Sequence, residues 1–269
     1  MRLLVKSISF AGALCVLPAA VASADGVLMV MKVTSDGAAP QTTQVQIDAR
    51  RMRTEGFGGA GEKQVAIFDG TKKVMILVDE SKKTYVELTE ADLEGMSGIM
   101  SQLQQQIASM PPEQRAQMEQ MMKGRGMALP GAAAAKTVYT KTGTGTVGKW
   151  TCDKYEGTNG GQKVSEVCTV DPKALGFTAA DFDVSRELAA FFKKAMPMGG
   201  MDVFSIGTPA DQGFSGIPVR NVSTVAGRQV TTEITEVKRQ AFPDSVFQPP
   251  AGFQKQDFMA GRGRGRGRQ

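Results

Sequence analysis

Short apolar runs separated by polar turns dominate the chain from residue 27 to residue 88. Around Val45 and Ile47, apolar and polar residues alternate strictly, which is the period-two pattern of a half-buried strand. Asp69-Gly70 separates two of the runs and is a hairpin turn signal. Together these features predict an antiparallel meander of five strands, at 27–33, 44–50, 65–68, 74–78 and 84–88.

The hydrophobic period changes at Thr89 from two residues to between three and four. Thr89 and Asp92 match the beginning of a capping box, which marks a helix N-terminus. Pro111-Pro112 ends this helix, and a second, methionine-rich helix is expected at 113–123, followed by an alanine-rich linker at 124–135. The first helix carries one apolar face, formed by Leu93, Met96, Met100, Leu103, Ile107 and Met110.

Strand patterns return after the linker and are interrupted by one further helix at about 179–195. The expected strands lie at 138–142, 150–156, 163–170, 219–225 and 228–239, and the fold closes with the segment 242–253. We interpret this order as a mainly β, α+β fold. It would consist of one strongly curved antiparallel sheet, an incomplete β-barrel, with helices packed on its concave face.

The first 24 residues have the layout of a cleavable signal peptide. Arg2 and Lys6 precede a short apolar segment, and Ala22-Ser23-Ala24 fits a cleavage site before Asp25. We therefore expect a protein exported to the periplasm or the extracellular space and soluble after cleavage. It would form a single domain over 25–254 with a helical insertion at about 89–123.

The C-terminal segment 255–269 is expected to be a disordered Gly-Arg tail. The whole chain has 32 Lys and Arg against 27 Asp and Glu, and the excess of positive charge comes from this tail and the signal peptide. The tail offers a contact to anionic surfaces of the cell envelope. Because no aromatic residue is interleaved for base stacking, we expect no specific nucleic-acid binding. The charged residues concerned are Arg262, Arg264, Arg266 and Arg268.

Two cysteines, Cys152 and Cys168, remain after signal cleavage, and they lie on adjacent expected strands. In an exported protein a disulfide between them is the favoured interpretation. Two free thiols or a metal pair are the alternatives, although two thiolates alone make a poor closed metal site.

Histidine is absent from the chain, which removes the usual general base and the commonest metal ligand. The segment Gly143–Lys149 has most of a phosphate-binding loop pattern, but Trp150 stands where that motif needs Ser or Thr. The residues after Trp150 also have a strand pattern rather than a helical one. We therefore expect no enzyme activity, no cofactor and no metal site.

The order of elements and several local motifs resemble the LolA-like fold of periplasmic lipoprotein carriers. Val65–Gly70, followed by Val74–Asp79 and Tyr85-Val86, is similar to the central hairpin of that family, and Ser245–Gly252 is similar to its closing strand. The segment Trp150–Tyr155 resembles an uncharacterised family of exported bacterial proteins, domain of unknown function 4412.

This resemblance implies a half-barrel with a hydrophobic cleft under a helical lid. Such a protein would be a non-catalytic carrier that binds a lipid, an acyl chain or a lipoprotein. The cleft residues expected on this basis are Val45, Ile47, Ile67, Met75, Leu93, Met96, Met100 and Leu103.

Two other functions remain open from the sequence. One is a structural or interaction module of the cell envelope whose core is filled and which has no ligand. The other uses some of the 16 methionines as soft thioether ligands for Cu(I). Methionine also fits ordinary helix packing and an adaptable, lipid-facing lid.

Overall fold

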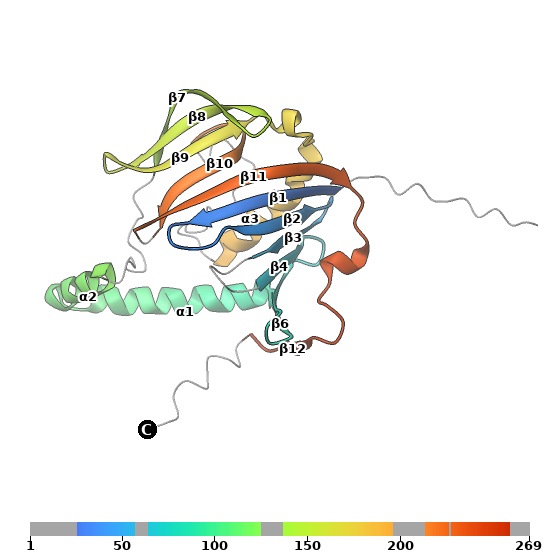
Figure 1. The fold of residues 1–269 in the computed structure, drawn as a ribbon. Helices are drawn as coiled ribbons and strands as arrows, with labels where there is room; N and C mark the ends of the chain where they lie inside the picture. Colours follow the sequence, from blue (N-terminus) through green and yellow to red (C-terminus); the bar gives the residue numbers. More distant parts are fainter. Residues whose placement is uncertain (1–25, 57–63, 125–136, 196–212, 226, 259–269) are drawn as a thin grey trace, which may run out of the picture.

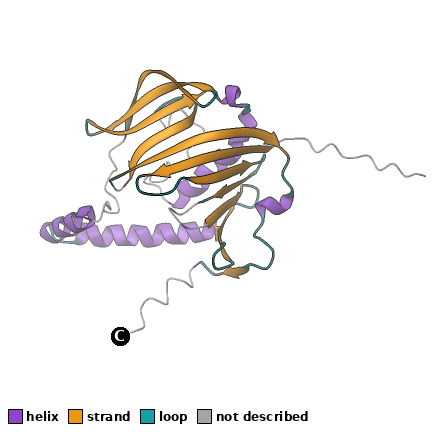
Figure 2. Cartoon of the chain, viewed as in Figure 1, coloured by secondary structure: helices purple, strands orange, loops and turns teal. Residues whose placement is uncertain are grey.

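The computed structural model (Figures 1 and 2) describes residues 26–56, 64–124, 137–195, 213–225 and 227–258. Its main element is a twelve-stranded sheet. The strands are β1 Gly26–Ser35, β2 Gln41–Ile47, β3 Arg51–Glu55, β4 Gln64–Asp69, β5 Val74–Asp79, β6 Thr84–Thr89, β7 Val138–Val147, β8 Trp150–Asn159, β9 Gln162–Val170, β10 Ile217–Val225, β11 Arg228–Gln240 and β12 Gln254–Gln256.

The strand order is β12-β6-β5-β4-β3-β2-β1-β11-β10-β9-β8-β7. All pairs are antiparallel except β12 with β6, which is parallel. Because the order ends on two different strands, the sheet is open, and it curves visibly across its width (Figure 2). The predicted class, a mainly β fold with an open, curved antiparallel sheet, is therefore confirmed.

Three α-helices accompany the sheet: α1 Glu90–Ser109, α2 Pro112–Gly124 and α3 Asp183–Ala195. The short 3-10 helices η1 Pro172–Leu175 and η2 Ala179–Phe182 lead into α3, and η4 Asp244–Phe247 follows β11. The α3 helix packs against β3, whereas α1 contacts α3 and β6 and then extends away from the sheet, with α2 at its far end (Figure 1). A helical cover over the concave face is not confirmed by this arrangement.

The β4–β5 hairpin is buried on both faces. Successive side chains of each strand point to opposite faces, so they contribute alternately to two hydrophobic clusters. Phe68 and Met75 join the larger core, which contains the inner face of α3 with Val184, Leu188 and Phe191. On the opposite face, the smaller core consists of Val65, Ile67, Ile76, Val78 and Phe247, so it is closed by η4.

Three parts of the chain differ from the elements expected from sequence. β3 was not expected, because Met52 is the one strongly apolar residue in it and its arginines resemble a surface loop. The segment 242–253, expected to close the fold as a strand, instead forms η4, and the closing strand β12 lies after it. β7 continues through the glycine-rich segment to Val147, where a tight turn leads into β8.

The turns on either side of β5 share one sequence pattern, Asp-x-x-Lys-Lys. Asp69 and Asp79 each accept a hydrogen bond of 3.0 Å from the backbone N–H three residues later. In both turns the second lysine, Lys73 or Lys83, adopts the left-handed backbone conformation, with φ of 54° and 51°. The Asp69 turn therefore closes through four loop residues between Asp69 and Val74.

Candidate functional site

The α1 helix carries a line of apolar side chains that begins in the core, is exposed at Ile99 and Leu103, and is buried again at Ile107. A complete capping box starts the helix, because Thr89 and Asp92 each accept a backbone hydrogen bond from the other. Leu93 is 2% exposed and belongs to the larger core, whereas Ile99 and Leu103 are 52% and 41% exposed. We define the α1 stripe as Leu93, Met96, Ile99, Leu103 and Ile107, at helical spacings of three and four.

The rest of α1 is polar but uncharged over a long stretch. Residues 95–110 contain no Asp, Glu, Lys or Arg, and the exposed positions outside the α1 stripe are glycine, serine, glutamine and alanine. At its C-terminus Arg115 donates hydrogen bonds to the carbonyl oxygens of Ala108 and Met110, at 2.8 and 3.2 Å. This satisfies helix-end acceptors and places a positive charge at the negative end of the helix dipole.

The structure brings most of the predicted cleft residues together and separates others. Val45, Ile47, Met75 and Leu93 belong to the larger core, and Met96 packs against it. Ile67 lies in the smaller core on the opposite face of the sheet, and Leu103 is exposed. The side chain of Met100 lies outside the described residues, as do Arg262, Arg264, Arg266 and Arg268.

Sequence reasoning missed Ile99. Spacings of three and four from Met96 lead either to Met100 or to Ile99, and the predicted stripe contains only Met100. The step from Ile99 to Leu103 is also one helical turn, so the signal was present in the sequence.

The larger core is closely packed where the cleft was expected. Val27 and Ile47 are each 1% exposed, and Val184 of α3 is 0% exposed. The ring centroids of Phe68 and Phe191 lie 5.4 Å apart, so α3 fills the space over β4. The apolar surface that remains accessible is therefore on α1 rather than on this part of the sheet.

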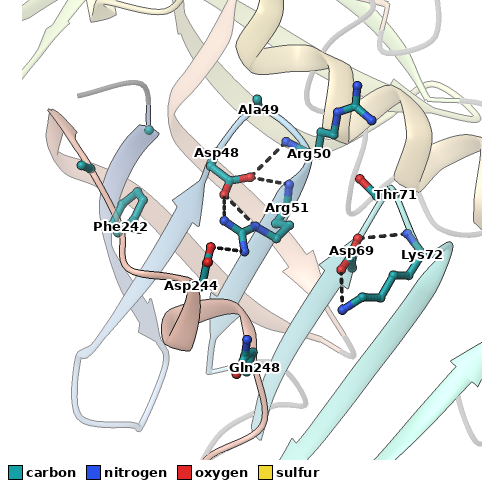
Figure 3. Close-up of a pocket in the computed structure, with 12 residues that line it drawn as sticks. Asp48, Ala49, Arg50, Arg51, Asp69, Thr71, Lys72, Phe242, Asp244 and Gln248 are labelled. Atoms are coloured by element: carbon teal, nitrogen blue, oxygen red, sulfur yellow. Dashed lines mark hydrogen bonds and ion pairs between the residues drawn. The ribbon is translucent and has the colours of Figure 1, made fainter. Parts of the chain in front are cut away.

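A separate pocket of about 660 Å³ lies at the end of the sheet where the β2–β3 and β4–β5 turns meet the segment after β11 (Figure 3). Eight of its twelve lining residues are polar or charged, and the turn aspartates among them were not predicted as site residues. Its lining residues are Gly26, Asp48, Ala49, Arg50, Arg51, Asp69, Thr71, Lys72, Ala241, Phe242, Asp244 and Gln248.

Several charged groups of this pocket bind one another. Arg51 donates from Nε to Asp48 Oδ2 and from Nη1 to Asp244 Oδ1, both at 2.8 Å. Its guanidinium also lies 4.5 Å from the centroid of the Phe247 ring. Burial acts to lower the pKa of Arg51, but the hydrogen bonds and charges of Asp48 and Asp244 outweigh it, and the pKa is raised. These contacts fasten η4 to β3, which is a structural role.

Cys152 on β8 and Cys168 on β9 form a disulfide, with their Cα atoms 5.5 Å apart. They are not directly opposite in the ladder, because Cys168 pairs with Lys154. The bond joins the two strands diagonally, two positions apart. Both cysteines belong to the larger core, so the bond lies on the core-facing side of β8 and β9.

Among the residues that the structure describes, no helix is both long and apolar enough to span a membrane. The same residues contain no group of three or more His, Cys, Asp or Glu side chains placed to hold a metal ion.

Comparison with known families identifies the class of protein. The model of a domain of unknown function, DUF4412, matches residues 89–253, which is more than half of the chain. The chain belongs to this family. No curated protein matches it.

Two solved structures are distantly similar to the chain. An uncharacterized conserved protein from Thermus thermophilus shares 10% identity at a TM-score of 0.43, covering 87% of this chain and 91% of that one. The LolA superfamily protein NE2245 from Nitrosomonas europaea shares 8% identity at a TM-score of 0.26, covering 83% of this chain and 89% of that one. Likeness at this level carries no conclusion about ligands.

Proposed function

We propose that this protein is an exported, non-catalytic binding protein for a hydrophobic or acylated ligand, such as a lipid or the acyl chain of a lipoprotein. The observation that carries the proposal is the α1 stripe. Ile99 and Leu103 lie on one face of a helix that extends away from the sheet, and the same face continues into the larger core at Leu93. An acyl chain along this face would cover apolar surface that is otherwise in water.

Two further features support the proposal. The Cys152–Cys168 disulfide is typical of proteins that fold in an oxidising compartment, such as the periplasm. The chain has no histidine, so catalysis would need a different general base. We place the ligand at the start of the exposed part of α1, beside Met96, because a flexible thioether adapts to apolar chains of different shape.

A second candidate function is an interaction module of the cell envelope without a small ligand. The tight packing of the larger core favours it, because α3 already fills the space over β4 that a carrier would keep open. In that case the α1 stripe would contact a protein partner. Cu(I) binding through methionine is a third, weaker candidate.

Binding of a fluorescent fatty acid separates these functions. We expect saturable binding by the wild type, and we expect the double variant Ile99→Gln/Leu103→Gln to bind at least about tenfold more weakly. Because both residues are exposed, its thermal midpoint should change little. The matched control is Val138→Gln, which removes an apolar residue that is even more exposed, 61%, from β7 and should leave binding unchanged.

A third variant, Leu93→Gln, should instead destabilise the fold because Leu93 is buried. If the wild type binds no fatty acid, the carrier function is wrong and the interaction module remains. Native mass spectrometry of the protein purified from its own compartment then distinguishes an acyl adduct, no adduct and bound Cu(I).

A further inference from the structure

We propose that the pocket at the end of the sheet binds a zwitterionic ligand, in which a short linker joins a phosphate group to an ammonium group. Free phosphoethanolamine compounds and the headgroup of phosphatidylethanolamine share this chemistry. The pocket is separate from the α1 stripe, because none of the residues that line it belongs to α1. The inference therefore goes beyond the proposed function and does not depend on it.

The two turns on one side of the pocket are fastened to each other. The N–H of Gly70 donates a hydrogen bond of 2.9 Å to the carbonyl oxygen of Arg50, which joins the β4–β5 turn to the β2–β3 turn. Only glycine fits at position 70, since an added Cβ would lie 3.0 Å from the same oxygen and would collide with Glu187 of α3. The side chains that these turns carry are therefore held on a fixed backbone, which lowers the cost of ordering a binding site.

Two of the three carboxylates in the pocket are already occupied by the protein itself. Asp48 accepts hydrogen bonds from the N–H groups of Arg50 and Arg51, at 3.0 and 2.7 Å. Its other oxygen lies 2.8 Å from Nε and 2.6 Å from Nη2 of Arg51, so its acceptor sites are filled. Asp69 is 8% exposed and contacts the N–H and Nζ of Lys72, at 3.0 and 3.2 Å. Neither carboxylate is available to a ligand.

The positive charges on the same two turns remain accessible. Arg50 is exposed, and its guanidinium forms no ion pair within the part of the chain that the structure describes. The side chain of Lys72 is 73% exposed and contacts only one oxygen of Asp69, so the ammonium keeps further donors. Thr71 adds an exposed hydroxyl next to it. Arginine binds phosphate through paired N–H groups and lysine binds it as a point charge, so this side of the pocket suits a phosphate group.

The segment after β11 forms the opposite side of the pocket and presents a negative charge (Figure 3). The side chain of Asp244 is 79% exposed. Its Oδ1 accepts a hydrogen bond of 2.8 Å from Arg51, and its Oδ2 has no partner among the described residues. Phe242, two residues earlier, also lines the pocket, and the face of an aromatic ring attracts a cation. This side therefore suits an ammonium group.

The charge balance of the lining favours a zwitterion over a simple anion. Three Arg and Lys side chains face three Asp side chains, so the pocket has no net charge. A simple anion would be attracted by Arg50 and Lys72 but repelled by Asp244, whereas a ligand with both charges satisfies both sides. The volume of about 660 Å³ lies within the range of small-molecule sites and leaves room for the glycerol part of a headgroup.

Isothermal titration calorimetry of the full secreted chain with two soluble headgroup compounds tests the inference. Glycerophosphoethanolamine has the phosphate and the ammonium group, whereas glycerophosphoglycerol has the same phosphate without the ammonium group. We expect the first to bind at least about tenfold more tightly. Arg50→Gln should weaken its binding by about tenfold, because a charge-assisted contact is lost. Asp244→Asn keeps an acceptor for Arg51 and should remove the preference between the two compounds.

The matched control is Arg220→Gln, which removes an exposed arginine from β10 and should change neither affinity. A short-chain phosphatidylethanolamine, used below its micelle concentration, identifies the source of the ligand. Tighter binding than that of glycerophosphoethanolamine would support the site as one for a lipid headgroup, and equal binding would support it as one for a free compound.

Equal affinity of the wild type for glycerophosphoethanolamine and glycerophosphoglycerol, or no binding of either, would overturn the inference. Binding that Arg50→Gln leaves unchanged would place the compound elsewhere on the protein and would also overturn it. Ile99→Gln/Leu103→Gln should not affect the binding of glycerophosphoethanolamine. Loss of fatty-acid binding alone would therefore count against the proposed function and not against this site.

Discussion

Arg239 on β11 forms an ion pair with Asp181 in η2, and Nη1 of the arginine lies 3.0 Å from Oδ1 of the carboxylate. Asp181 also accepts hydrogen bonds from the backbone and hydroxyl of Thr178, at 2.6 and 2.8 Å. The guanidinium in turn donates to the carbonyl oxygen of Gly176. One buried carboxylate, 7% exposed, thus attaches the connection before α3 to the sheet.

This ion pair predicts an acid-dependent loss of stability. Burial acts to raise the pKa of Asp181. The hydrogen bonds and charge of Arg239 and the hydrogen bonds of Thr178 together lower it by more than burial raises it, so the pKa lies below its ordinary value. A carboxyl group of this kind stabilises the fold above its unfolded pKa of about 3.9, and the contribution disappears as the pH falls through the lower, folded value. We expect Asp181→Asn to reduce the free energy of unfolding at pH 7 by about 2–4 kcal/mol.

Urea unfolding at pH 7 and at stepwise lower pH measures this effect. The difference in the free energy of unfolding between Asp181→Asn and the wild type should become smaller as the pH falls below about 4. Asp183→Asn is the control, because Asp183 is exposed, and it should cost less than about 1 kcal/mol. A difference that is independent of pH would contradict the claim that the ionised carboxylate of Asp181 stabilises the fold.

The two Asp-x-x-Lys-Lys turns predict opposite effects for neighbouring lysines. Lys83 has a φ of 51°, a conformation that glycine adopts without strain, so Lys83→Gly should stabilise the protein by about 0.5–1 kcal/mol. Lys73 has the same conformation, but its Nζ also lies 3.4 Å from Oε2 of Glu187. Lys73→Gly loses this ion pair, so it should stabilise the protein less than Lys83→Gly does. Lys82 is outside the left-handed region, and Lys82→Gly should destabilise. Thermal unfolding of the three variants ranks them, and the prediction fails if Lys82→Gly is the most stable.

The sequence was most informative where a local signal agrees with burial. The capping box at Thr89 and the β4–β5 hairpin formed as predicted, because each depends on residues close together in the chain. β3 was missed because its support is remote. Arg51 packs on Phe247, and Arg53 donates to the carbonyl oxygen of Val246, almost two hundred residues later.

The candidate site was harder to predict than the sheet. The apolar period of α1 is the same whether the helix covers a cleft, fills a core or extends into solvent. Only the arrangement of α3, which occupies the face of the sheet over β4, shows that Ile99 and Leu103 remain exposed. Ile67 is as buried as its neighbours in β4. Its place in the smaller core, rather than beside the predicted cleft residues, depends on η4 packing on that face of the sheet.

The disulfide should contribute measurably to stability. Its two cysteines are 16 residues apart, and closing a loop of this size is worth about 3 kcal/mol in the chain-entropy account. We expect Cys152→Ala/Cys168→Ala to lose about 2–4 kcal/mol of unfolding free energy by urea titration. Peptide mapping without reductant should find the two cysteines linked. Two thiols that react with an alkylating agent in the native exported protein would contradict the bond.

The proposed export makes a prediction about the mature N-terminus. The expected cleavage after Ala24 leaves Asp25 as the first residue, immediately before β1. Intact mass and N-terminal sequencing of the secreted protein should identify this residue. A secreted chain that retains Met1, or one acylated at Cys15, would show that the N-terminal segment is processed differently.

The glycines of α1 provide a last test, because they concern the helix that carries the proposed site. Gly95 and Gly98 are exposed, and a Cβ added at either would meet no atom within 4 Å. Alanine should therefore stabilise α1 by about 0.5–1 kcal/mol at each position through its higher helix propensity.

Much of α1 extends beyond the sheet, so it can open without unfolding the core. We expect Gly95→Ala/Gly98→Ala to slow amide hydrogen exchange in α1 while the exchange of β1 and β11 stays unchanged. Gly216→Ala is the contrasting variant, because its φ is +91° and the new Cβ would lie 2.8 Å from the carbonyl oxygen of Val170. It should destabilise the sheet by more than about 1 kcal/mol. Equal slowing of exchange in α1 and β1 by the double variant would mean that α1 unfolds only together with the sheet.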